Sequence, residues 1–143
     1  MFGTIVLGFD ESQHANLAAE KVKALAKAQG DKVLVVHVQP LINPSRGGPV
    51  VGESGGEAHQ VLDAAVADLA AAGIETSGQL HRGATDQVGQ ILIDVAHEAG
   101  AGLIAVGTRG RSDAQSMFLG SVAHQVIHRS PIPVLVVRDT SDE

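Results

Sequence analysis

The chain lacks cysteine, tyrosine and tryptophan, and it has only three phenylalanines among its 143 residues. Without cysteine it has no disulfides, no thiolate metal ligands and no cysteine nucleophile. The shortage of aromatic side chains removes the stacking platforms on which proteins that bind single-stranded nucleic acids hold their bases. These absences exclude several classes of extracellular scaffold, redox enzyme and nucleic-acid-binding protein.

Positive charge is also scarce, because ten Lys and Arg residues face sixteen Asp and Glu residues and leave a formal net charge of −6. Proteins that bind duplex nucleic acid need clustered positive charge, so we expect no nucleic-acid partner. A nucleotide is still compatible with this balance, since backbone dipoles, one or two arginines and a metal ion can hold its phosphates.

Long apolar runs are missing as well. The N-terminal segment MFGTIVLGFDES has an apolar run of strand length only, and no basic stretch precedes it. We therefore expect neither a signal peptide nor a membrane-spanning segment, and we expect a cytoplasmic location.

What the chain does have is a regular alternation of apolar runs with segments of helical period. The runs cover residues 4–9, 33–38, 76–81, 103–106 and 134–137. Four of them are almost continuously apolar, as in parallel strands covered on both faces, and the third is polar enough for an edge strand. Helical stripes end before Gly30, Gly73 and Gly100, and a short fourth stripe holds Val122, Val126 and Ile127.

This alternation predicts one α/β domain over residues 1–143. We predict an open, parallel, five-stranded Rossmann-like sheet with strand order 3-2-1-4-5 and helices on both faces. Residues 40–56 are rich in proline and glycine, and we expect a long mobile loop there, either a lid or a disordered segment.

The segment GTRGRSDAQSMFLGSV, at residues 107–122, carries the strongest chemical signal. It places glycines at 107, 110 and 120 and a hydroxyl at Ser121. Glycines allow backbone N–H groups to approach a bulky anion, and a helix beginning at Ser121 would direct its free N–H groups at that anion. The segment is not a Walker loop, because that motif has a lysine before the hydroxyl residue and this chain has Gly120 there. The pattern predicts a phosphate-binding loop, with a flexible glycine loop as the alternative.

The spacing Gly-x2-Gly-x9-Gly-Ser resembles the nucleotide motif of the universal stress protein family. The likeness extends to Phe9-Asp10-Glu11-Ser12, His37-Val38 and Pro131-Ile132-Pro133. The resemblance implies binding of ATP, or of ADP or AMP, with Mg²⁺ accompanying ATP. It implies the following site, from the adenosine end through the ribose to the phosphates: Asp10 and Val38, then Gly107, then Gly110, Gly120, Ser121 and the backbone of Val122.

Charged residues in the loop complicate this assignment. Arg109 and Arg111 are the positive charges nearest the phosphates, although loop arginines are more often solvated than bound to a ligand. The chain has Asp113-Ala114-Gln115 where loops of that family commonly carry a glycine and a basic residue. The charge of Asp113 would weaken phosphate binding unless it faces a cation. For Asp10 itself, the alternative role is a helix N-cap or a solvated turn residue.

Three histidines have alternative roles of their own. His124 and His128 have the four-residue spacing of metal ligands. No nearby carboxylate or cysteine completes a ligand set, so we expect a surface pair and no metal site. His37 lies at the end of the second apolar run, beside the expected pocket, either as a pH-sensitive pocket residue or as a partly buried histidine with no catalytic role.

No catalytic constellation stands out, and we expect an adenine-nucleotide-dependent regulatory module in the stress response. The alternatives are a slow ATPase or self-phosphorylating enzyme, with Ser116 or Ser121 as acceptor, and a nucleotide-free structural or interaction protein. The last apolar run, Val134–Val137, would leave an exposed sheet edge. Together with the family resemblance, this edge predicts a homodimer through that strand.

Overall fold

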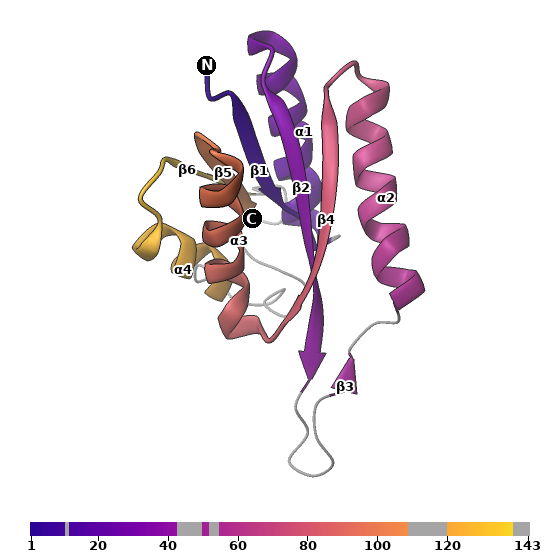
Figure 1. Ribbon diagram of the computed structural model, residues 1–143, viewed down its shortest axis with the longest axis vertical. Coiled ribbons are helices and arrows are strands. Elements are labelled where there is room, and N and C mark those ends of the chain that lie inside the picture. The colour runs from indigo at the N-terminus through magenta and orange to yellow at the C-terminus, as the bar shows by residue number, and fades with distance from the viewer. Residues whose placement is uncertain (11, 43–49, 52–54, 109–119, 139–143) are drawn as a thin grey trace.

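The computed structural model of the protein describes residues 1–10, 12–42, 50–51, 55–108 and 120–138. Apart from the short strand β3, which was not predicted, strands and helices alternate as expected (Figure 1). In chain order the elements are β1 (Thr4–Gly8), α1 (Gln13–Gln29), β2 (Lys32–Ile42), β3 (Val50–Val51), α2 (Gly55–Ala71), β4 (Thr76–Gly83), α3 (Thr85–Ala99), β5 (Leu103–Gly107), α4 (Ser121–Arg129) and β6 (Val134–Val137).

Five of the strands form a parallel sheet in the order β4-β2-β1-β5-β6. Counted along the chain without the two-residue strand β3, this is the predicted order 3-2-1-4-5. The polar third run forms β4, which among the described strands pairs only with β2 and so lies at one edge, as its composition indicated. At the other edge, the described part of the chain gives β6 no strand partner besides β5.

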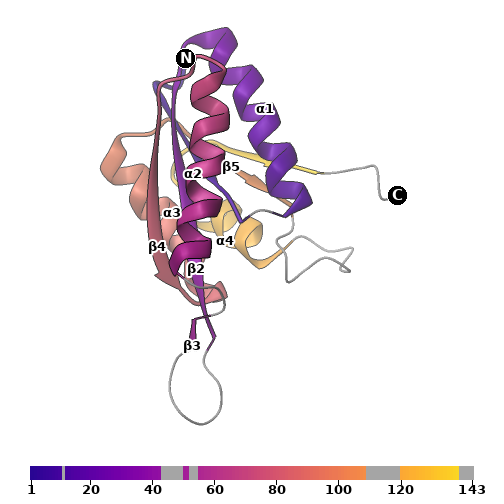
Figure 2. The ribbon, with the colours of Figure 1, turned by 90° about the vertical axis from the view of Figure 1, so that its right-hand side faces the viewer.

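Helices cover both faces of the sheet (Figure 2). On one face α1 and α2 pack over a core that includes Ile5, Leu7 and Val35. On the other face α3 and α4 pack over a second core that includes Val6, Val36 and Ile104. Ile5, Val6 and Leu7 are fully buried because β1 lies in the middle of the sheet between these two layers, which explains its continuously apolar sequence.

The helices end where the sequence provides a glycine. Gly30 and Gly100 have positive φ values of 75° and 65°, and each donates its backbone N–H to the carbonyl oxygen four residues back. L-residues with a side chain rarely adopt this left-handed conformation, so glycine stops α1 and α3 at these positions. Each stop turns the chain directly into the next strand.

Strand β2 is longer than predicted, and Val38 does not close it. The strand continues to Ile42, because β4 pairs with it through Pro40 and β3 then pairs with its last two residues in antiparallel fashion. Pro40 lies beyond the end of β1, where β2 has fewer strand partners and a missing N–H is tolerated. The expected loop at residues 40–56 is therefore wrong at both ends, since α2 also begins at Gly55; residues 43–49 and 52–54 lie outside the described residues.

The fourth helical stripe is only partly correct. Val126 is fully buried and Val122 is half-buried, but Ile127 is 46% exposed. Successive residues on a helix are rotated by about 100°, so Ile127 follows Val126 out of the protected face. In the described part of the chain, no helix is long and apolar enough to cross a membrane.

Candidate functional site

The carboxyl ends of the parallel strands lie together at one end of the sheet, which we call its carboxyl edge (Figure 1). Distant parts of the chain meet there. Asp10 follows β1, Thr108 follows β5, and the first turn of α4 lies beside them. The backbone N–H of Gly120 donates to the carbonyl oxygen of Thr108 at 2.7 Å, and the N–H of Thr108 donates to the Val137 carbonyl oxygen at 2.9 Å. Thr108 therefore joins the end of β5 to the end of β6 and to the start of α4.

Asp10 shapes the turn between β1 and α1. Its Oδ1 accepts the backbone N–H of Ser12 at 3.0 Å. Ser12 in turn caps α1, because its Oγ accepts the backbone N–H of Ala15 at 3.1 Å. The N-cap considered for Asp10 thus belongs to Ser12, while Asp10 is the half-buried turn residue that precedes it. This turn fixes the Asp10 carboxyl group at the carboxyl end of the sheet.

Buried polar side chains gather at this same edge. Four residues are buried there: Ser12 in the turn after β1, His14 in the first turn of α1, and His37 and Gln39 in the carboxyl-terminal half of β2. His37 is fully buried, and its Nδ1 lies 2.7 Å from the Phe9 carbonyl oxygen. Because a carbonyl oxygen only accepts hydrogen bonds, Nδ1 carries a proton in this contact. His37 is therefore a fixed interior residue that holds the end of β1 against β2.

His14 and Thr108 form a second link across the edge. The Nδ1 of His14 lies 3.1 Å from Oγ1 of Thr108, so the first turn of α1 is connected to the residue that follows Gly107 in the glycine segment. Gly107 makes this approach possible, since a Cβ there would lie 2.7 Å from the Cβ of His14 and 2.9 Å from the backbone nitrogen of Ala15. Sequence reasoning missed both His14 and Thr108.

Helix α4 begins at Ser121, as predicted, and presents an uncapped N-terminus. Gly120 is its N-cap residue, and no side chain in the described part of the chain caps it. The free N–H groups of the first turn, with the positive end of the helix dipole, favour a negatively charged group at this position. Ser121 is exposed there, and Val122 is half-buried against the core.

The structure thus brings together most of the site residues that the sequence indicated. Asp10, Gly107, Gly120, Ser121 and Val122 lie at the carboxyl edge of the sheet. Val38 lies within β2, paired with His81, and its side chain is half-buried against the core under α3. Arg109, Gly110, Arg111, Asp113 and Ser116 lie outside the described residues.

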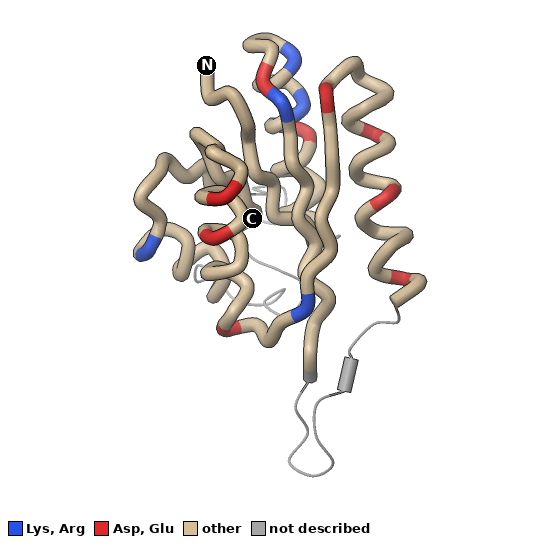
Figure 3. The backbone as a smooth tube through the Cα atoms, viewed as in Figure 1, with Lys and Arg blue, Asp and Glu red and all other residues tan. Residues whose placement is uncertain are grey.

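The positively charged side chain of Arg82 lies on the part of the sheet where β2 and β4 continue past the end of β1. The Nε of Arg82, on β4, donates to Oε1 of the buried Gln39 at 3.0 Å. Figure 3 shows other Lys and Arg residues near the amino-terminal ends of the strands, on α1 and at the start of β2. The sequence contained little to reveal Arg82, because its strand was predicted to end at residue 81.

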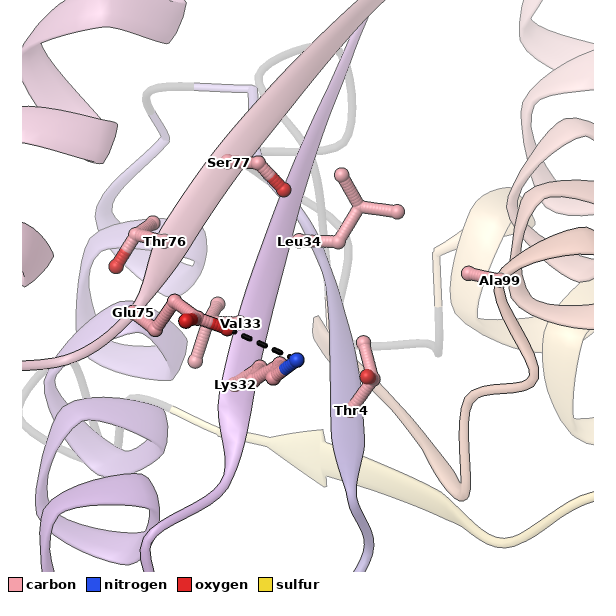
Figure 4. Close-up of a pocket in the computed structure, with 8 residues that line it drawn as sticks. All are labelled: Thr4, Lys32, Val33, Leu34, Glu75, Thr76, Ser77 and Ala99. Atoms are coloured by element: carbon pink, nitrogen blue, oxygen red, sulfur yellow. Dashed lines mark ion pairs between the residues drawn. The ribbon is translucent and has the colours of Figure 1, made fainter.

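A shallow hollow of about 370 Å³ opens at the amino-terminal edge of the sheet, away from this site. Its walls include Thr4, Leu34, Ser77 and the ion pair between Lys32 and Glu75, whose nitrogen and oxygen are 3.0 Å apart (Figure 4). Both charged side chains are largely exposed, so water screens the pair. The hollow contains none of the residues that carry the phosphate-binding signal.

Comparison with known proteins gives a consistent result. The model of the universal stress protein family matches residues 1–138. A universal stress protein of Thermus aquaticus is 34% identical over 139 residues, which cover 96% of this chain and all of that protein. A solved universal stress protein of Archaeoglobus fulgidus superposes with a TM-score of 0.74 at 28% identity, over 96% of this chain and 99% of its own.

Two further structures were solved with nucleotides. A universal stress protein in complex with cAMP has a TM-score of 0.71 at 26% identity, over 96% of this chain and 97% of its own. An Archaeoglobus fulgidus universal stress protein in complex with dAMP has a TM-score of 0.70 at 25% identity, over 96% of this chain and 98% of its own. The family match over nearly the whole length, with the shared fold, leads to one conclusion: the chain belongs to the universal stress protein family.

Proposed function

We propose that the chain binds an adenine nucleotide at the carboxyl edge of its sheet and acts as a nucleotide-dependent regulatory module in the stress response. The observation that carries this proposal is the N-terminus of α4, which no side chain of the described residues caps and which the hydrogen bond from Gly120 to Thr108 holds against the end of β5. In open α/β sheets ligands bind outside the carboxyl ends of the strands, which is where this N-terminus lies.

The two ends of a nucleotide match two parts of this edge. The backbone N–H groups of Gly120, Ser121 and Val122 would hold the phosphates, since the first turn of a helix favours anions. The carboxyl group of Asp10 would accept hydrogen bonds from nucleoside hydroxyl or amino groups, and the backbone of Val38 would face the adenine. Gly107 would contribute backbone only, because the space beside its Cα is filled by the first turn of α1.

Among nucleotides, ATP accompanied by Mg²⁺ is the ligand we propose, with ADP and AMP as alternatives. Two structural relatives were solved with cAMP and with dAMP, which share an adenine base and a phosphate. That shared chemistry supports the adenine nucleotide as a class. We also propose that the protein is cytoplasmic and forms a homodimer.

We propose binding without efficient catalysis. Holding phosphates in the ground state does not accelerate their transfer, which needs an oriented nucleophile and charge stabilisation in the transition state. One observation favours a slow self-phosphorylating enzyme instead: Ser121 is exposed at the proposed phosphate-binding site. Turnover on the order of 1 s⁻¹ that persists after rigorous purification would favour the enzyme. We expect turnover far below that rate.

Thermal unfolding with and without ATP and Mg²⁺ tests the proposed site. A ligand that binds only the native state stabilises it by about 2.7 kcal/mol at a hundredfold excess over its dissociation constant. We expect a clear rise in the melting temperature of the wild type and none in Gly120→Val, whose side chain would block the approach of phosphate to the first turn of α4.

The matched control is Gly55→Val, at the start of α2. A Cβ at Gly55 meets no atom within 4 Å, so this variant should keep both the fold and the shift. An undiminished shift in Gly120→Val, with its circular dichroism spectrum unchanged, would show that the phosphates bind elsewhere.

A further inference from the structure

Two histidines lie together on the exposed face of α4. His124 and His128 are both exposed, and the centroids of their rings are 4.2 Å apart with an angle of 49° between the ring planes. Residues four apart on a helix are neighbours on one face, one turn above the other. The two imidazoles therefore already lie side by side in the folded protein, and bringing them together costs no further ordering of the backbone.

The sequence alone favoured a surface pair with no metal site, but it did not show how the two rings lie. From their side-by-side placement we propose that His124 and His128 form a chelating pair for a divalent transition metal ion. Zn²⁺, Ni²⁺ and Cu²⁺ are the candidates, because imidazole nitrogen suits these ions. Each ring would donate the lone pair of one nitrogen, and water would fill the remaining coordination positions on this exposed surface. This ion differs from the Mg²⁺ that accompanies ATP, since Mg²⁺ prefers oxygen ligands in octahedral geometry.

The electrostatic setting favours a cation at this end of α4. His128 lies in the last turn of the helix, where the dipole presents its negative end. The neighbouring Arg129 opposes the ion, but it is exposed and its charge is screened by water and salt. The net charge of the chain, −6, adds a general attraction for cations.

A site with only two protein ligands differs from the usual zinc sites of proteins. Structural zinc sites use four protein ligands and catalytic ones use three. The described residues contain no group of three or more histidine, aspartate or glutamate residues suited to a metal ion. The pair is therefore an open surface chelate that binds reversibly, and the fold does not depend on it.

Calorimetric titration of ZnCl₂ into the full chain, after EDTA treatment and its removal, tests the proposal. We expect one ion per chain in the wild type. His124→Ala and His128→Ala should each weaken binding by at least about tenfold, because each leaves a single imidazole donor. Alanine is the best helix former, so neither exposed substitution should unfold α4. His97→Ala, which removes a single exposed histidine from α3, is the matched control and should bind as the wild type does.

Electron paramagnetic resonance of the Cu²⁺-loaded protein gives a second reading. We expect the spectrum of two nitrogen ligands in the wild type and in His97→Ala, and its loss in both α4 variants. Wild-type binding no tighter than that of His124→Ala and His128→Ala would overturn the proposal. So would loss of binding in His97→Ala, because the ion would then be held on another helix.

Discussion

At the scale of single residues, Asp31 is the clearest electrostatic feature of the fold. Its side chain is buried, and its Oδ1 accepts hydrogen bonds from the Met1 ammonium at 2.8 Å and from the backbone N–H groups of Phe2 and Gly3 at 2.9 and 3.0 Å. The ammonium first, and then these N–H groups, lower the pKa of Asp31 below its ordinary value of 3.8, against the opposing effect of burial. The Asp31 carboxyl group thus holds the three residues that precede β1 in place.

Replacing this carboxyl group, in Asp31→Asn, should destabilise the protein by about 1–3 kcal/mol at neutral pH, because charged hydrogen bonds are lost in a buried place. A lowered folded-state pKa contributes stability above the unfolded pKa, and that contribution is lost as the pH falls through the folded value. Urea unfolding should therefore show a gap between wild type and variant that is full at pH 7 and closes below a pH of about 4. A gap independent of pH would mean that Asp31 acts through packing alone.

Gly107 is the residue at which packing and the proposed site meet. In Gly107→Ala the new methyl group would press on the first turn of α1, and overpacking of this kind costs about 1–3 kcal/mol. Denaturant unfolding measures this loss. Gly55→Ala, at a position with open space, is the matched control and should unfold at or above the wild-type midpoint. Equal stability of Gly107→Ala and the wild type would show that α1 moves aside freely.

At the scale of elements, the apolar runs and glycine stops carried most of the information about the fold. Buried parallel strands and helix-ending glycines are determined locally, so the sequence predicted β1, β5, β6 and the ends of α1 and α3 closely. The extension of β2 was missed because it depends on partners far along the chain: Gly83 on β4 and the two residues of β3. A proline at residue 40 argued for a loop there, and only the neighbouring strands show why it is tolerated.

The candidate site divides in the same way. The start of α4 at Ser121 and the position of Asp10 followed from patterns within a few residues of each. The contact of His14 with Thr108, 94 residues apart, could not be anticipated, because neither residue carries a pattern of its own. The sequence placed His37 beside the expected pocket with two alternative roles. Its fully buried contact with the Phe9 carbonyl oxygen supports the role of a buried histidine without catalytic function.

At the scale of the whole molecule, we predict that copies of the chain associate through the last strand. Val134, Leu135 and Val136 are only half-buried, and in the described part of the chain β6 pairs with β5 alone. An apolar edge of this kind invites pairing with another chain. Light scattering at micromolar concentration should give the mass of a dimer for the wild type and of a monomer for Val136→Lys.

The opposite edge of the sheet supplies the control for this experiment. Gln79→Lys, on the exposed strand β4, adds the same charge at the other edge and should leave the dimer intact. A monomeric wild type would contradict pairing through β6, and so would a Val136→Lys variant that keeps the wild-type mass.

Nucleotide binding is the central claim, and calorimetric titration of ATP and Mg²⁺ into nucleotide-free wild-type protein tests it most directly. Mass analysis of an extract from heat-denatured protein first establishes whether a nucleotide is carried through purification, and which one. The account predicts saturable binding of one nucleotide per chain, with loss of that binding in folded Gly120→Val. Heats equal to those of dilution for ATP, ADP and AMP alike, from a folded and nucleotide-free wild type, would contradict it.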